Sequence, residues 1–502
     1  MNIYMKLFYN TNKNALINLA LLSCIWISIN TGSKYLIIDY NLSGDINTYT
    51  NLIRSLLPYL VFCYFILKKN IYFKDLFVNF DLVFICFLLY GLFQLTGLIY
   101  TYTNLHEHYW IVCLFTLIFF FNYLLNNQNS YLIKLVFKIN ILFIFLLFLI
   151  FIITVLKENI FTTKLLYNSS AYHLTLMGEP HPRSSGLSRM ALIFLIFLNS
   201  YYFSNKLPKK YNFFILPINS FLIFIIYTIQ SRGAILFLFI LFFLILLIYN
   251  FKDFKLNLVY FVFTILIPIF MFMNYPVFKN FINQKNLNTE SIVEKTTSLN
   301  LSNIFRPEIT HAIGQKRNSL LKKEIINAIS SDRLNAWEYL IQVFFTGKVN
   351  DKMKKLLTVS GYEALDVKLI KKTNYITGLG PQADRQVMEI KKIASFADNV
   401  RGPFGSHASN IYIYSLICSG FFGLVTILTI NFIIMYRIII LFINRKKLSL
   451  HSNYYLNSAI LIILFLQFRG LVENSYGVFG VDLIMFISSY SIIARAYKKI
   501  NV

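Results

Sequence analysis

Long apolar runs separated by short polar segments account for most of this chain. Several of the runs, with their flanks, reach the roughly 20 residues that a helix needs to cross a bilayer. The strand-length alternation of a membrane β-barrel, about 10 residues per crossing, is absent. We therefore predict an all-α polytopic membrane protein with about twelve transmembrane helices, at 15–33, 52–67, 80–100, 109–125, 135–156, 187–204, 212–229, 233–250, 256–275, 409–436, 453–469 and 476–494.

One long polar stretch breaks this pattern between the ninth and tenth runs. It divides the chain into residues 1–275 with helices one to nine, a large, partly helical loop at 276–408, and residues 409–502 with helices ten to twelve. Inside the loop, apolar residues at helical spacing predict helices at 318–329 and 332–345. A third helix is expected after Gly378-Leu379-Gly380, running from Pro381 or Asp384 towards Ala397.

Composition and charge support a membrane protein and orient it. The chain is 57% hydrophobic and 14% charged, whereas charged residues make up about 25% of ordinary soluble domains. If the runs cross alternately, the Lys and Arg of the short loops collect on one side, which the positive-inside rule assigns to the cytoplasm. This distribution explains the net charge of +25 better than nucleic-acid binding does. Both termini are then cytoplasmic, and the long loop lies on the opposite, outer side of the membrane.

Cysteines and the first apolar run exclude two other interpretations. All five cysteines lie in apolar segments, which excludes a disulfide framework in the loop and a CxxC metal site. The first run follows Lys6 and Lys13 but has no small-residue cleavage site after it, so we expect a retained signal anchor.

Arginines stand where apolar runs begin or end on the predicted outer face. Arg183 and Arg189 flank the start of the sixth run, and Arg232 lies between two runs with almost no loop around it. A charge at such a place is usually paired, extended towards the interface, or part of a site. The planar guanidinium suits a diphosphate because it donates two parallel hydrogen bonds and keeps its charge. Further candidates at helix mouths are Arg333, Arg385, Arg401 and Arg469.

The long loop is itself basic. Residues 275–410 hold 20 Lys and Arg against 12 Asp and Glu, against the positive-inside trend. An anionic substrate or anionic headgroups would account for the surplus, while solvated helix faces account for most of the lysines.

His407 and Glu473 are the candidate bases. His407 stands just before the tenth run, where an imidazole could accept a proton from a sugar hydroxyl. Glu473 is a second candidate, with pairing to Arg469 as the alternative. His106 and His108 are treated as interfacial polar residues, because side chains at i and i+2 do not share a helix face. No nucleotide-binding loop or metalloprotease motif is present, and we expect no metal or cofactor.

Four stretches together resemble the bacterial O-antigen ligase and O-antigen polymerase superfamily of inner-membrane glycosyltransferases. They are Arg183-Ser184-Ser185-Gly186-Leu187, Ser231-Arg232-Gly233-Ala234, Asp332-Arg333-Leu334-Asn335-Ala336-Trp337, and Gly378-Leu379-Gly380 followed by His407, Asn410, Gly420 and Gly423. The likeness covers about residues 180–430. The sequence departs from the family at Ser409, beside Asn410, and at Cys418, where many members have a glutamate.

The resemblance implies a C-type glycosyltransferase architecture. Such an enzyme transfers a glycan from undecaprenyl diphosphate to a periplasmic hydroxyl without metal or nucleotide. Arg183 and Arg232 match the family's diphosphate-holding arginines, and His407 matches its loop histidine. We assign catalytic roles to His407 and Arg232. Substrate binding is assigned to Arg183, Arg189, Arg333, Arg401, Asn410 and Glu473.

The favoured function is ligation of O-antigen to the lipid A core, in lipopolysaccharide or surface polysaccharide biosynthesis. A polymerase, whose acceptor is a second lipid-linked glycan, shares the same donor, arginines and topology. A lipid-linked glycan flippase is the alternative from another class, although it would be expected to carry charges along a central cavity. The expected location is the bacterial inner membrane, with the active site facing the periplasm.

Overall fold

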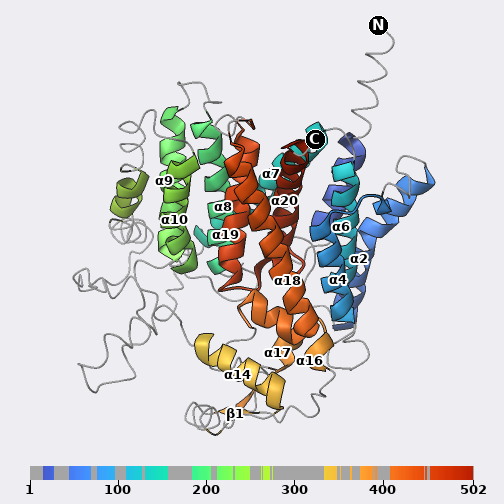
Figure 1. Ribbon diagram of the computed structural model, residues 1–502. Helices are drawn as coiled ribbons and strands as arrows, with labels where there is room; N and C mark the ends of the chain where they lie inside the picture. Colours follow the sequence, from blue (N-terminus) through green and yellow to red (C-terminus); the bar gives the residue numbers. More distant parts are fainter. Residues whose placement is uncertain are drawn as a thin grey trace, which may run out of the picture.

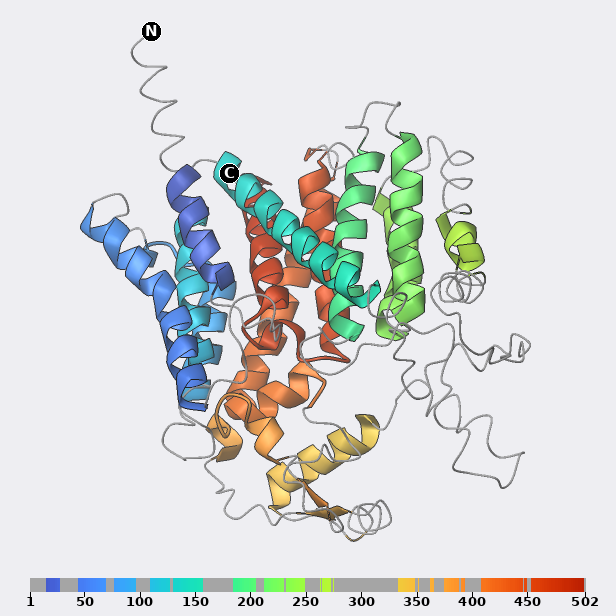
Figure 2. The same ribbon diagram turned by 180° about the vertical axis from the view of Figure 1, so that it is seen from behind.

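The computed structural model describes the helical bundle and part of the long loop. The described residues are 15–27, 44–68, 76–95, 109–126, 130–156, 184–204, 212–229, 232–248, 262, 264–271, 274, 333–347, 351, 362–364, 374–387, 390–392, 408–445, 447–448 and 453–500. Figures 1 and 2 show a bundle of apolar helices with the loop elements gathered beyond one of its ends, which we call the loop end.

The bundle is built from helices that fall on the predicted apolar runs. Besides the helix Ala15–Ile27, they are α2 (Gly44–Leu67), α4 (Leu82–Leu95), α6 (Tyr109–Asn126), α7 (Ser130–Leu156), α8 (Ser184–Phe203), α9 (Asn212–Ile229), α10 (Arg232–Ile248), α18 (Ile411–Ile443), α19 (Tyr454–Gly470) and α20 (Val481–Ile500). In a bilayer the backbone has no water to bond with, so an apolar run satisfies its own N–H and C=O groups by becoming a helix.

Three of these helices have described spans that are long and apolar enough to cross a membrane. They are Tyr131–Ile153, Gly186–Phe203 and Ile411–Ile443. Shorter apolar helices of 10–17 residues accompany them at Ala15–Ile27, Leu56–Leu67, Leu82–Leu95, Trp110–Asn126, Phe214–Thr228, Gly233–Ile245 and Tyr454–Gly470. An α-helical fold with membrane-capable helices is therefore confirmed, and the number of twelve spans stays a prediction.

Helix α20 lies in the middle of the bundle. Its residues from Val481 to Ala494 are all buried, and it packs against α7, α18 and α19. Buried amides and hydroxyls add to the apolar packing: Trp26 donates to Asn140, and Asn140 donates 3.0 Å to the hydroxyl of Ser488 on α20. Such bonds between helices are worth roughly 0.6–2 kcal/mol each in a membrane.

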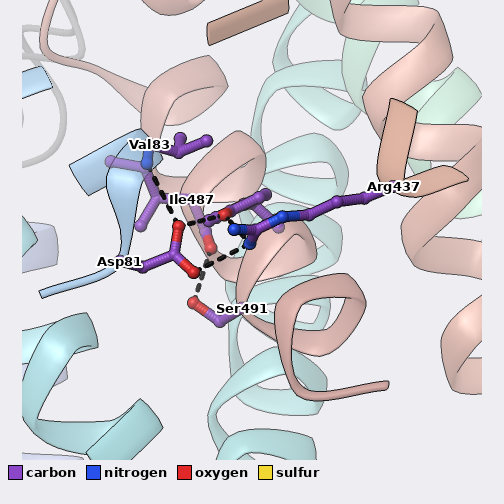
Figure 3. Close-up of polar contacts among 6 residues, drawn as sticks. Asp81, Val83, Arg437, Ile487 and Ser491 are labelled. Atoms are coloured by element: carbon purple, nitrogen blue, oxygen red, sulfur yellow. Dashed lines mark hydrogen bonds and ion pairs between the residues drawn. The ribbon is translucent and has the colours of Figure 1, made fainter. Parts of the chain in front are cut away.

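A buried ion pair joins three helices away from the loop end. Arg437 of α18 lies 2.8 Å from the carboxylate of Asp81, just before α4, and also donates to the hydroxyl of Tyr490 on α20. Tyr490 donates to the other carboxylate oxygen, which also accepts the N–H of Val83 (Figure 3). Because both carboxylate oxygens are bonded, the desolvated charges are compensated.

Part of the long loop folds around a second, smaller core. Its elements are α14 (Arg333–Thr346), α16 (Asn374–Thr377), α17 (Ala383–Val387) and the strands β1 (Tyr362–Ala364) and β2 (Ile390–Lys392). Residues such as Leu340 and Phe344 pack with Leu379 and with Ile417 at the start of α18. Burial raises the pKa of Tyr339, in this core, to about 12.

Two of the three helices predicted in the loop can be compared with the structure. The helix expected at 332–345 is confirmed as α14, whereas the helix expected at 318–329 lies outside the described residues. The third prediction, a helix running towards Ala397, is confirmed over α17 and wrong at residues 390–392, which form a strand. Residues 390–392 instead pair antiparallel with 362–364, Tyr362 opposite Lys392.

Helix α18 is interrupted where this loop core meets the bundle. Gly420 has φ +66° and ψ −165°, which breaks the helical hydrogen bonding. The N–H groups of Leu379 and Gly380 donate 2.9 Å to the carbonyl oxygens of Ile417 and Cys418, so the exposed carbonyls find partners in the loop. The Gly378-Leu379-Gly380 segment is therefore the joint between loop and bundle.

Candidate functional site

Five helix ends meet at the loop end of the bundle. They are the first turns of α8, α10, α18 and α20 and the last turn of α19. Side-chain contacts connect four of these ends, and the start of α10 lies against the turn after α19. This is the face on which the sequence predicted the arginines, the histidine and Glu473.

A buried cluster of one carboxylate and two guanidiniums holds three of these ends together. Asp482 in the first turn of α20 forms an ion pair with Arg189 of α8 at 2.9 Å and accepts a hydrogen bond from Nε of Arg469, in the last turn of α19, at 3.0 Å. The side chain of Asp482 is 4% exposed, that of Arg189 16% and that of Arg469 11%. These three side chains alone sum to one positive charge in a largely desolvated place, and the nearby carboxylate of Glu473 also acts on Arg189.

Arg189 keeps donor capacity after this pairing. A guanidinium has five N–H donors, and Nε of Arg189 is buried without a hydrogen-bond partner among the described residues. An orphaned buried donor is costly and calls for an explanation. A bound anion would satisfy the donor and use the surplus positive charge.

Glu473 lies in the turn that follows Arg469. Its N–H donates 2.9 Å to the carbonyl oxygen of Arg469, so it belongs to the same helix end. The guanidinium of Arg469 donates to the carboxylate of Asp482, and its pairing with Glu473 stays a prediction.

Arg232 is the first residue of α10, and its backbone lies beside the same turn. A Cβ placed on the next residue, Gly233, would come 3.4 Å from the Val472 side chain. The start of α10 and the turn after α19 are therefore in contact, although the side chain of Arg232 lies outside the description. Arg333 is likewise described only as the first residue of α14.

Asn410 is the N-cap of α18. Its side-chain oxygen accepts from the N–H groups of Tyr412 and Ile413, and its NH2 group donates 3.0 Å to the carbonyl oxygen of Leu471. Its own N–H donates 3.1 Å to the side chain of Asn474. The residue predicted to bind substrate is thus engaged in capping and in joining α18 to the 471–474 turn.

His407, Arg183 and Arg401 lie outside the described residues. The chain is described again from Ala408, which is held firmly on two sides. Its N–H donates 2.7 Å to the Asp384 carboxylate in α17, and its carbonyl oxygen accepts the indole N–H of Trp337, also at 2.7 Å. Arg183 immediately precedes Ser184, the first residue of α8.

Asp482 is the residue that sequence reasoning missed at this site. The signal was present, since it is a lone carboxylate at the start of the last apolar run, and charges in such positions are expensive. Asp81 and Arg437 carried the same signal near the ends of their runs. Among the described residues, no group of three or more His, Cys, Asp or Glu could hold a metal ion.

Comparison with known proteins gives no relative. No protein-family model matches the sequence, and no curated protein or solved structure matches it either. The case for a function therefore depends on the residues at the loop end.

Proposed function

We propose that this protein is a metal-independent, polyprenyl-diphosphate-dependent glycosyltransferase of the O-antigen ligase and polymerase type. It would transfer a glycan from undecaprenyl diphosphate to a hydroxyl of a periplasmic acceptor, with the lipid A core as the favoured acceptor. In this proposal the chain crosses the bacterial inner membrane twelve times, with both termini in the cytoplasm. The loop end then faces the periplasm.

The observation that carries the proposal is the cationic cluster among the converging helix ends. Asp482 pairs with the guanidiniums of both Arg189 and Arg469, and these three groups sum to a formal charge of +1 beside the start of α10, where Arg232 lies. The carboxylate of Glu473 also acts on Arg189, so the charge available to a ligand depends on both carboxylates. Fixed cations in a site of low dielectric stabilise charge that develops on a leaving diphosphate. Neighbouring apolar helices would provide the lipid surface along which a polyprenyl tail can lie.

The loop core supports the same assignment by its position. Trp337 and Asp384 hold Ala408 at the start of α18, one residue after His407. We place the acceptor between this segment and the cationic cluster, with His407 as the candidate base. Fixed orientation of two reactants accounts for a large part of enzymatic rate enhancement.

The decisive experiment is a transfer assay with the full chain in lipid nanodiscs. Undecaprenyl-diphosphate glycan is offered with either lipid A core or a second glycan-lipid, and products are identified by mass spectrometry. We expect a covalent product and free undecaprenyl diphosphate; the acceptor that reacts separates ligase from polymerase. No product with either acceptor rules out both.

Arg232→Ala is expected to abolish transfer while insertion into the membrane remains normal, because the donor diphosphate loses a fixed cation. The matched control is Arg445→Ala, which removes an exposed arginine just past the far end of α18 and should leave the rate unchanged. Retained activity in Arg232→Ala would remove this residue from the diphosphate site.

A further inference from the structure

A cavity with aromatic walls lies next to the cationic cluster. Leu483, which follows Asp482 in the chain, is part of its lining, and the rest comes from α4, α6, the turn at 381–382, α18 and the 476–479 segment. The aromatic lining residues are Phe87, Tyr90, Trp110, Tyr414, Tyr476 and Phe479. The rings of Trp110 and Phe479 stack on each other with centroids 5.9 Å apart.

Two largely buried residues with amide side chains line this cavity. Gln94 of α4 is 4% exposed and Gln382 is 9% exposed. Within the described part of the chain, no hydrogen bond joins either side-chain amide to another group. Burying an amide without a partner costs free energy. Two such amides facing one cavity point to a bound partner that both donates and accepts.

The tyrosine hydroxyls of the same cavity behave differently. Tyr90 donates 3.0 Å to the carbonyl oxygen of Gly477, and Tyr476 donates 2.6 Å to the side chain of Asn431. Tyr414 accepts the N–H of Gln382 at 3.2 Å. The hydroxyls therefore hold the walls in place, while the two amides remain available.

The backbone at Gln382 is held in an unusual conformation. Its φ is +58°, in the left-handed region that side-chain-bearing residues rarely adopt. The bond from its N–H to Tyr414 and the neighbouring bond from Ala383 to Gly380 maintain this conformation. Strain of this kind gathers at functional sites, where it presents a side chain to a ligand.

The chemistry of the cavity selects its ligand. No charged side chain is among its lining residues, so an anion such as a phosphate is not favoured. Neutral amides pair well with hydroxyl groups, which donate and accept at once, and aromatic faces pack against the C–H face of a ring. The enclosed part has room for about one water-sized group, so a single hydroxyl or hydroxymethyl enters while the ring lies at the mouth.

We propose that this cavity is a subsite for an uncharged sugar residue, with Gln94 and Gln382 as the groups that recognise its hydroxyls. Its role, holding one sugar of the donor or acceptor glycan beside the cationic cluster, rests on the proposed function. Sugar binding does not require glycan transfer. The sugar-subsite proposal and the proposed transferase function can therefore fail independently of each other.

Binding is measured by saturation-transfer NMR on the full chain in nanodiscs, because maltoside detergents would compete with their own sugar headgroups. The probes are methyl glucoside, methyl galactoside and N-acetylglucosamine, with glycerol as a polyol that lacks a ring. We expect at least one glycoside, and not glycerol, to bind. Gln94→Leu should weaken that binding on the order of tenfold, since one amide provides up to two of the hydrogen bonds.

Thermal stability separates recognition from damage to the fold. An amide without a protein partner contributes nothing to folding, so Gln94→Leu should melt at or above the wild-type temperature. Gln382→Gly, which also relieves the positive φ, should do the same and again weaken binding. Gln342→Leu, an amide on α14 outside the cavity, is the control and should bind as wild type. The proposal is overturned if no glycoside binds, or if both cavity variants bind sugars normally.

Discussion

At the scale of single residues, Asp482 explains why two arginines can be buried so close together. Arg189 and Arg469 would repel each other without the carboxylate between them, and each would lose its hydration. Asp482 meets them at 2.9 and 3.0 Å, from a third helix. The cluster therefore fixes two guanidiniums at the loop end.

We expect Asp482→Asn to lower the free energy of unfolding by about 3–5 kcal/mol, because two buried guanidiniums lose their counter-charge. The measurement is thermal or denaturant unfolding in nanodiscs, followed by intrinsic fluorescence. Asp482→Glu, which keeps the charge, should recover much of the loss. An Asp482→Asn protein with wild-type stability would contradict the pairing.

The arginines of this site were predictable and their partner was not. Each arginine stands at the edge of an apolar run, and the neighbouring residues in the sequence are enough to show this. The pairing of residues 189 and 469 with 482 depends on how three helices pack. The same holds for Asp81 and Arg437, which are 356 residues apart.

At the scale of elements, the break in α18 and the Gly378-Leu379-Gly380 segment form one unit. A Cβ on Gly420 would lie 2.3 Å from the carbonyl oxygen of Ile376, and one on Gly378 would lie 2.4 Å from the backbone of Cys418. Only glycines permit this approach. The segment precedes helix α17, as predicted, and it also attaches the loop to the tenth predicted crossing.

Gly420→Ala should strongly destabilise this joint, because it adds steric overlap to the cost of a positive φ, about 1–2 kcal/mol. Gly347 has the same φ of +66°, but a Cβ added there would have no atom within 4 Å. Gly347→Ala therefore measures the cost of the positive φ without steric overlap. Gly480→Ala, with neither feature, should resemble wild type.

The readouts are melting temperature and the rate of limited proteolysis in the loop core. We expect the order Gly480→Ala, Gly347→Ala, Gly420→Ala from least to most affected. Equal behaviour of the last two would mean that the loop segment does not dock against the helix break.

At the scale of the whole molecule, the two ends of the bundle differ in kind. The loop core, the helix ends and the cationic cluster lie at one end, while the C-terminus lies at the other (Figure 1). A membrane plane across the apolar helices would place the two ends on opposite sides.

This arrangement predicts opposite labelling of two exposed positions. In a background with the five cysteines replaced by alanine, Glu338→Cys on α14 should react with a membrane-impermeant maleimide on spheroplasts. Lys498→Cys, near the end of α20, should react only after permeabilisation. The reversed pattern would invert the proposed orientation, and labelling of both from outside would exclude an odd number of crossings between them.

The local sequence pattern was enough to locate the bundle helices, because an apolar segment in a membrane must satisfy its backbone N–H and C=O groups within a helix. It also located α14, because apolar residues at helical spacing show which face of a helix is buried. It also located the arginines at the helix ends. Tertiary packing alone decided that Asp482 pairs with Arg189 and Arg469, that residues 390–392 form a strand, and that Gly378 docks at Gly420. It also brought Gln94 and Gln382 to one cavity. These features depend on contacts between residues far apart in the chain, and hydrophobic periodicity describes only neighbours.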